Sequence, residues 1–231
     1  MKGKPFSQVR GRRGWSQQQA ANRLGVSQAY VSMLESGARR LTPKLARRLM
    51  RVYGLSPTVL KPSVQVLRRP LDPQSFAEDL GELGYPGYAY LRAKRWKRNP
   101  CELLLLGLAQ QDLEARLVEA LPWLLMRYWD VDTRWLVEQS KLRDLQNRLG
   151  FVVGLARQAA DAKNSDDKLR ARVLEDLEKA LEPGKLARED TLCQKTLTKY
   201  EREWLYRNRA ELAKNWNLLT DWRAEYLRYV A

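Results

Sequence analysis

Residues that start and stop helices alternate along the first sixty positions, and their spacing limits this part of the chain to short helices. A serine or threonine precedes each main segment and a glycine follows it, as helix N-caps and C-caps require. The pattern predicts helices over residues 17–24, 28–35 and 43–53. A short helix around residues 6–13 precedes them, and the pair Ser56-Pro57 opens a fifth. We therefore expect five short helices here.

Basic residues are concentrated in the same part of the chain. The net charge is +15, and residues 1–70 hold 15 lysines and arginines against a single acid, Glu35. The remainder, residues 71–231, is almost neutral, with 27 basic and 26 acidic side chains. Positive charge collected on one small domain is typical of proteins that bind a polyanion. We therefore expect the first third of the chain to bind one.

The chain contains no histidine, which excludes several kinds of catalytic and metal sites. Neither a histidine-dependent nucleophilic relay nor a histidine-containing zinc site can form. Cys101 and Cys193 are too few for a structural zinc cluster, and their separation favours two free thiols in a reducing cytoplasm. The acids of the second half alternate with basic residues, as on a solvated helix face. We expect no metal, no cofactor and no enzymatic activity.

The sequence predicts a protein that does not contact a membrane. A membrane-spanning helix needs ~18 consecutive apolar residues, and the longest apolar run, residues 103–106, is far shorter. The first residues also lack the apolar segment and the small-residue cleavage site of a signal peptide. The expected location is the cytoplasm.

Prolines and arginines between residues 61 and 75 are typical of a linker, and a helical pattern follows it. Apolar residues recur at three-and-four spacing over residues 142–159 and again over 169–181. Thr198 and Glu201 fit a capping box for a later helix. No run of alternating strand residues occurs, so an all-α fold is expected throughout. The expected domains are a first domain over residues 1–60, a linker over 61–75 and a separate helical domain over 76–231.

The segment from Gln17 to Ser36 carries the most specific pattern in the chain. Small residues fall where two helices would cross closely, and a glycine falls where the turn between them needs a left-handed backbone. Apolar residues recur where the second helix would pack on the first. These positions are Ala20, Ala21, Leu24, Gly25, Val26, Val31 and Leu34. Over about residues 6–60 the chain thereby resembles the phage-repressor-like helix-turn-helix regulators, the Cro and Xre type.

The resemblance implies that the third helix lies in the major groove of double-stranded DNA. Its N-terminal end and outward face would then contact base edges through Gln28, Ala29, Tyr30, Ser32 and Met33. Gln28 is the best candidate, because a carboxamide can pair with adenine N6 and N7 together. Tyr30 could instead contact phosphate or pack inward, and Met33 is the weakest candidate because a thioether hydrogen-bonds poorly.

A second set of residues would position the domain on the phosphate backbone. The resemblance places Gln17 there, and the next candidates are Ser27, Arg39, Arg40, Lys44, Arg12 and Arg13. It implies a structural role for Arg10 and Glu35, because this family commonly joins these two positions in a partly buried ion pair. Trp15 is expected in the core, under the turn before the second helix.

The resemblance implies a transcription regulator, and we expect a repressor that binds a near-palindromic operator as a homodimer. Residues 76–231 would supply the dimer contacts or bind a ligand or protein partner. The alternative is the antitoxin of a toxin–antitoxin pair, in which residues 76–231 neutralise a toxin while the first domain represses the operon. All tryptophans except Trp15 lie at or beyond Trp96. They could line a ligand pocket or form ordinary core.

Overall fold

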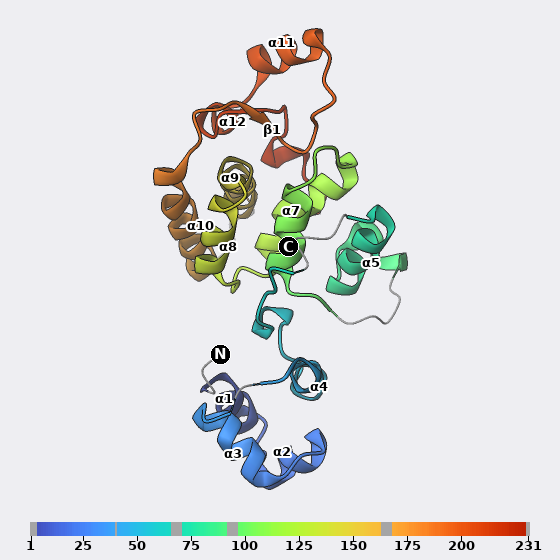
Figure 1. The fold of residues 1–231 in the computed structure, drawn as a ribbon, viewed down its shortest axis with the longest axis vertical. Helices are drawn as coiled ribbons and strands as arrows, with labels where there is room; N and C mark the ends of the chain where they lie inside the picture. The colour runs from blue at the N-terminus through green and yellow to red at the C-terminus, as the bar shows by residue number, and fades with distance from the viewer. Residues whose placement is uncertain (1–3, 40, 66–70, 92–96, 163–167, 230–231) are drawn as a thin grey trace. The chain divides into compact units, whose positions relative to one another are not determined.

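The computed structural model describes residues 4–39, 41–65, 71–91, 97–162 and 168–229. It divides the chain into two compact units, Met1–Lys61 and Pro62–Ala231, each drawn in Figure 1. Each unit has its own apolar core. Helices dominate both units, which confirms the prediction of an all-α fold.

Short helical segments make up the described part of the first unit. In chain order they are α1 (Lys4–Arg12), α2 (Gln17–Leu24), α3 (Gln28–Ser36), α4 (Pro43–Tyr53) and the 3-10 helix η1 (Pro57–Val59). The N-cap side chains of α2, α3 and α4 each accept a backbone N–H of the first turn, and a left-handed glycine ends each helix. Local sequence therefore sets these boundaries, as predicted.

The core of the first unit fixes the angle between α2 and α3. Ala20 and Ala21 are fully buried, because their small side chains let α3 approach α2 closely. Val31 and Leu34 fill the space between α3 and the other helices. The remaining buried side chains of this core are Phe6, Leu24, Leu45, Leu49 and Tyr53. Burying aliphatic and aromatic side chains of this size contributes about 1.5–3 kcal/mol each, which holds the pair rigid.

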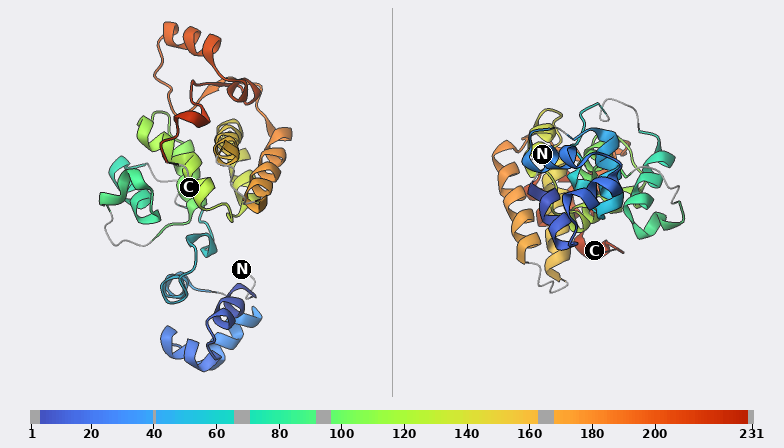
Figure 2. Two further views of the ribbon diagram at one scale, coloured as in Figure 1. Left: turned by 180° about the vertical axis from the view of Figure 1, so that it is seen from behind. Right: turned by 90° about the horizontal axis from the view of Figure 1, so that it is seen from below.

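The second unit is a helical bundle built around one long helix, α9 (Gln146–Ala162). Figure 2 shows α9 between α7 and α10, and it also packs against α6, α8 and α12. The other elements are α5 (Pro73–Leu83), η3 (Pro86–Leu91), α6 (Pro100–Leu108), α7 (Ala115–Arg127), α8 (Thr133–Lys141), α10 (Lys168–Leu181), η4 (Glu182–Gly184), β1 (Asp190–Thr191), α11 (Lys199–Asn208), α12 (Glu211–Asn215), β2 (Leu218–Leu219) and η5 (Ala224–Tyr226).

Two glycines allow the chain near α12 to lie directly on α9. A Cβ atom at Gly150 would be 2.4 Å from the ring of Trp216, and one at Gly154 would be 2.5 Å from Leu212 Cδ1. Trp216 is fully buried as a result. A glycine normally weakens a helix interior, so this close approach is the physical reason for both glycines.

The all-α fold contains a very short strand pair that the sequence did not indicate. β1 and β2 pair in parallel, with Asp190 opposite Leu218 and Thr191 opposite Leu219. Each strand has two residues, which is too short for a period-two pattern to appear in the sequence.

The predicted apolar stripe over residues 142–159 begins too early. Leu142 lies between α8 and α9 and is 75% exposed, whereas Leu145 is buried. Asp144 has a φ of 55°, and this left-handed residue ends one helix before the next begins. The later stripe over residues 169–181 corresponds to α10, although Leu169 is exposed.

The predicted linker over residues 61–75 overlaps the second unit. Pro62 is buried, and the backbone N–H of Ser63 donates to Glu102 Oε1 at 2.6 Å. α5 begins at Pro73 after its N-cap Asp72, so the helical part starts before residue 76. Residues 66–70 lie outside the described residues.

The tryptophans of the second unit have different surroundings. Trp123 and Trp216 are buried in the apolar core, whereas Trp204 on α11 is 46% exposed. Trp222 lines a pocket between α9 and the C-terminal segment, and Trp96 lies outside the described residues. The interpretation as ordinary core therefore holds for Trp123 and Trp216, and the ligand pocket stays a prediction. None of the helices in the described ranges has the length and apolar character to cross a membrane.

Candidate nucleic-acid interface

The turn between α2 and α3 has the geometry that its sequence predicts. Gly25 has a φ of 58°, and its N–H donates to the carbonyls of Ala21 and Asn22. The N–H of Val26 also donates to the Ala21 carbonyl at 3.1 Å. Ser27 Oγ then accepts the N–H of Tyr30 and begins α3. A side chain at position 25 would strain this backbone, so glycine fixes the direction in which α3 leaves the turn.

The five residues predicted to contact bases all lie on α3, but they differ in exposure. Gln28 and Ala29 are exposed, and Tyr30, Ser32 and Met33 are partly buried. Tyr30 packs in part against the core, as one of its two predicted alternatives requires. Its ring also lies 4.8 Å from the guanidinium of Arg39.

Four polar side chains form a chain of contacts across α1, α2 and α3. Arg10 Nε and Nη2 donate to the two carboxylate oxygens of Glu35 at 2.6 and 3.0 Å, and Arg10 Nη1 donates to the Trp15 carbonyl at 2.7 Å. Gln17 Nε2 donates to the same carboxylate at 3.0 Å. Gln28 Nε2 in turn donates to Gln17 Oε1 at 2.6 Å. These contacts connect the ion pair of Arg10 and Glu35 to the side chain of Gln28 at the start of α3.

The ion pair keeps Glu35 charged despite its low exposure. Burial alone would raise the pKa of Glu35, but the hydrogen bonds from Arg10 and Gln17 outweigh it and lower that pKa. The hydrogen bond between Arg10 and Glu35 also raises the pKa of Arg10. The side chains of Arg10 and Glu35 are 19% and 8% exposed. The only acid of the first seventy residues is therefore held by a partner inside the domain.

The residues predicted to contact phosphate are placed differently from one another. Arg12, Lys44 and Arg39 are exposed, whereas Gln17 is occupied in the polar chain described above. Ser27 serves as the N-cap of α3. Arg40 lies outside the described residues.

Arg13 contacts the end of another helix. Its Nη1 and Nη2 donate to the carbonyls of Val52 and Tyr53 at 3.1 and 2.8 Å. These carbonyls lie in the last turn of α4, where backbone acceptors lack partners within the helix. The guanidinium of Arg13 therefore stabilises α4.

Trp15 is only partly buried, although a core position was predicted for it. Its ring packs edge-on against Tyr53 at 5.4 Å, and the guanidinium groups of Arg13 and Arg23 lie 5.0 and 4.5 Å from it. Cations over an indole ring stabilise such a partly exposed position. The indole thus joins the core to the basic surface.

Arg48 is a basic residue at the turn that the sequence pattern did not single out. A Cβ atom at Gly25 would be 2.8 Å from both Nη atoms of Arg48, so this guanidinium lies directly on the turn. Arg48 comes from α4, far from the turn in sequence, and no local spacing predicts this approach.

The comparison with known families covers the same segment. Residues 7–60 match the family model described as Helix-turn-helix. No curated protein and no solved structure matches the chain. The family match and the geometry of α2, the turn and α3 agree on the same residues. Residues 7–60 therefore form a helix-turn-helix domain of the Cro and Xre type, the DNA-binding part of a transcription regulator.

Proposed function

We propose that this protein is a sequence-specific repressor that acts in the cytoplasm, with α3 in the major groove of its operator. The observation that carries the proposal is the position of Gln28, exposed at the start of α3 and held by Gln17. One N–H of the Gln28 amide donates to Gln17. The second N–H and Oε1 then remain for N7 and N6 of an adenine. A glutamine held in this way loses little side-chain entropy when it pairs with the base.

The exposed cations of the first unit would supply the phosphate contacts. Arg12, Arg39 and Lys44 are all exposed, and the single acid Glu35 is neutralised by Arg10. Phosphate contacts of this kind fix orientation without reading sequence. Ser27 can still donate its hydroxyl hydrogen to a phosphate, because only its oxygen is used as a cap. In this proposal Gln17 holds the amide of Gln28 in place, and this role is additional to its predicted contact with the phosphate backbone of DNA.

The regulator would bind as a homodimer through the second unit. The first unit has a strongly positive surface, and two copies of it repel each other. The second unit is almost neutral, and its helix α11 exposes Tyr200, Trp204 and Tyr206. Exposed aromatic side chains of this kind are enriched in protein interfaces. A two-fold dimer would then place two α3 helices about 34 Å apart on a near-palindromic site.

Selection of binding sites from random DNA by the full-length protein tests this function. We expect two inverted half-sites whose centres are about ten base pairs apart or a multiple of this, and adenine contacts at one position in each. A selected pool without a shared motif would contradict sequence-specific regulation. A single half-site, bound by a monomer in light scattering, would contradict the dimer.

The antitoxin function is the second candidate, and the same exposed aromatics of α11 support it. A toxin could occupy this surface in place of a second copy. Coexpression with the product of an adjacent gene tests it: growth arrest by that product alone, relieved by this protein, is the expected result. Relief that survives Trp204→Ala would place the toxin elsewhere, and an adjacent product without toxicity would exclude this candidate.

A further inference from the structure

A pocket of about 590 Å³ opens on the second unit beside β1 and the first turn of α9. Five basic side chains line it, and they come from separate segments of the chain. They are Arg143, Arg148, Arg188, Lys195 and Arg202. Three acids, Asp144, Glu189 and Asp190, also line it. The pocket therefore has an excess of positive charge in a part of the chain that is otherwise almost neutral.

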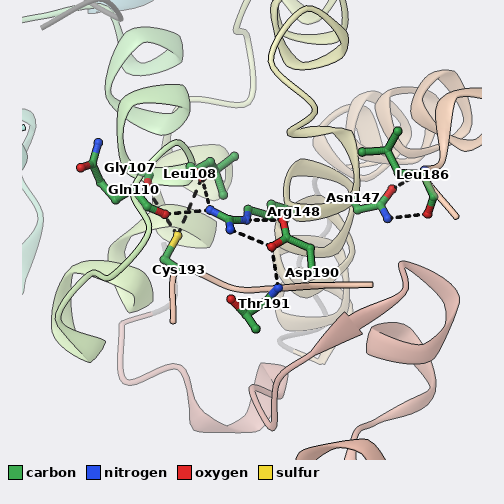
Figure 3. Close-up of polar contacts among 9 residues, drawn as sticks. All are labelled: Gly107, Leu108, Gln110, Asn147, Arg148, Leu186, Asp190, Thr191 and Cys193. Carbon is green, nitrogen blue, oxygen red and sulfur yellow. Dashed lines mark hydrogen bonds and ion pairs between the residues drawn. The ribbon is translucent and has the colours of Figure 1, made fainter. Parts of the chain in front are cut away.

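The floor of the pocket is fixed by Arg148 and Asp190, which Figure 3 shows at the centre of a set of polar contacts. Arg148 Nε and Nη2 donate to the two carboxylate oxygens of Asp190 at 2.7 and 2.8 Å. Arg148 Nη1 donates to the carbonyls of Leu108 and Gln110 at 2.8 and 2.7 Å. Burial alone would raise the pKa of Asp190, but the hydrogen bond from Arg148 lowers it. These two charges cancel each other.

Asp112 fixes the loop that carries Lys195, one of the residues that line the pocket. Its Oδ1 accepts the N–H groups of Lys195 and Thr196 at 2.9 and 3.1 Å, and its Oδ2 accepts the Thr196 hydroxyl at 2.8 Å. The N–H of Leu113 donates to the Cys193 carbonyl at 3.0 Å. The loop that carries Lys195 is thus tied to the loop between α6 and α7, and the pocket is preformed.

The remaining charges leave an unbalanced positive field in the pocket. Glu189 lies 4.0 Å from Arg202 and 3.7 Å from Arg209, so its charge is shared between two arginines. Arg188 and Lys195 differ, because their side chains form no hydrogen bond or ion pair with any residue that the structure describes. The acids that act on them lie nearby, because Arg188 helps to lower the pKa of Asp190 and Lys195 helps to lower that of Asp112.

The start of α9 adds to this field. Leu145 and Arg148, on either side of the helix start at Gln146, both line the pocket. The first turn of α9 contains no acid that would neutralise the positive end of the helix dipole. A bound anion would therefore meet the Arg188 and Lys195 side chains and the helix dipole together.

We propose that this pocket binds a small organic phosphate of about nucleotide size. Its volume lies within the ~300–1,000 Å³ that small-molecule sites usually have. Guanidinium and ammonium groups that converge from different segments match the several oxygens of a phosphate group. The exposed amide of Gln111 and the Thr191 side chain can bind the uncharged part of the ligand. The proposal is independent of how residues 7–60 read DNA.

Isothermal titration calorimetry of the full-length protein with AMP and with pyrophosphate tests the site. The test variant is Arg188→Gln combined with Lys195→Gln. The control is Lys168→Gln combined with Arg172→Gln, which removes the same charge from exposed positions of α10. We expect at least one probe to bind the wild type and the control, and to bind the test variant at least tenfold more weakly.

Two results would overturn the proposal. One is that neither probe binds the wild type at millimolar concentration, and the other is that the test variant and the control bind equally well. Equal binding by all three proteins would place the anion on the basic first unit. Melting curves of both variants check their folding, and since all four replaced side chains are exposed, wild-type melting is expected.

Discussion

Gln28 and Gln17 share a hydrogen bond of 2.6 Å that joins the start of α3 to the start of α2. This bond holds the amide of Gln28 in a position from which it can read a base. Gln28→Ala should therefore cost about 1–3 kcal/mol at the cognate site and relax the preference at one base pair in each half-site. Binding measured on a library of mutated operators checks this result.

Arg39→Ala is the matched comparison for Gln28→Ala on the same surface. Arg39 is exposed beside Tyr30 and is proposed to contact phosphate. Its loss should weaken binding to all sequences about equally and make the salt dependence shallower by roughly one unit. If both substitutions lower affinity uniformly, the assignment of Gln28 to base reading is wrong.

Arg10→Ala should lower the stability of the first unit. Removal of Arg10 leaves the Glu35 carboxylate, 8% exposed, with Gln17 as its remaining partner. Breaking one side of a well-shielded ion pair costs roughly 3 kcal/mol, and thermal melting at neutral pH measures it. Arg12→Ala removes an exposed arginine of the same helix and should leave melting unchanged. Wild-type melting of Arg10→Ala with lost DNA binding would instead place Arg10 on the phosphate backbone.

The ion pair between Arg10 and Glu35 also leads to a prediction about how stability depends on pH. The pKa of Glu35 is lowered in the folded protein, so its stabilising contribution is complete above its ordinary value of 4.5. The contribution disappears as the pH falls through the lowered pKa, because Glu35 is then protonated in both states. The difference in melting temperature between wild type and Arg10→Ala should therefore shrink between pH 7 and pH 3. A constant difference would show that Arg10 stabilises the fold without the charge of Glu35.

A truncated protein that ends near Pro70 should fold, remain monomeric and bind the operator far more weakly than the full chain. Its own compact unit ends at Lys61, so the truncation removes no residue from that unit. One such domain reads a single half-site, whereas a dimer gains a second contact at high effective concentration. Light scattering and a DNA titration on both proteins decide the matter. A monomeric full-length protein, or equal affinities, would refute the proposed dimer.

Gly150→Ala and Gly11→Ala should change stability in opposite directions. Alanine is favoured over glycine in a helix by about 1 kcal/mol, and a Cβ atom at Gly11 meets nothing within 4 Å. At Gly150 the Cβ atom would lie 2.4 Å from the Trp216 ring, and overpacking of this kind costs about 1–3 kcal/mol. Chemical denaturation measures both changes. Stabilisation by Gly150→Ala would mean that Trp216 is free to move away from α9.

The first unit could be predicted closely because its helix boundaries depend on neighbouring residues. Ser16, Ser27 and Thr42 each cap the helix that follows directly. The outward face of α3 follows from helical periodicity once Val31 and Leu34 are known to be buried. Patterns that act over three or four residues are visible in a single sequence.

Contacts between distant segments could not be predicted in this way. Arg13 was expected on phosphate, and its contact with the end of α4 depends on how α4 packs. The bidentate contact of Arg148 with Asp190 joins residues from a helix and a strand that no local pattern connects. The pairing of β1 with β2 also joins distant segments, and each two-residue strand is too short to show a period in the sequence. Such contacts depend on how all the helices pack together, and no short stretch of sequence determines that packing.

The pairing of β1 with β2 has a consequence for how this protein can vary in evolution. The chain leaves the core after Cys193 and is back against α9 at Leu212, and the pairing of β1 with β2 joins the segments on either side of this excursion. α11 therefore belongs to a loop whose ends are fixed, and Leu205 is its buried anchor. Doubling the length of such a loop costs only about 0.6 kcal/mol. Insertions and substitutions in α11 can accumulate while α9 and its neighbours keep their sequence, so relatives of this protein can change partners without changing their fold.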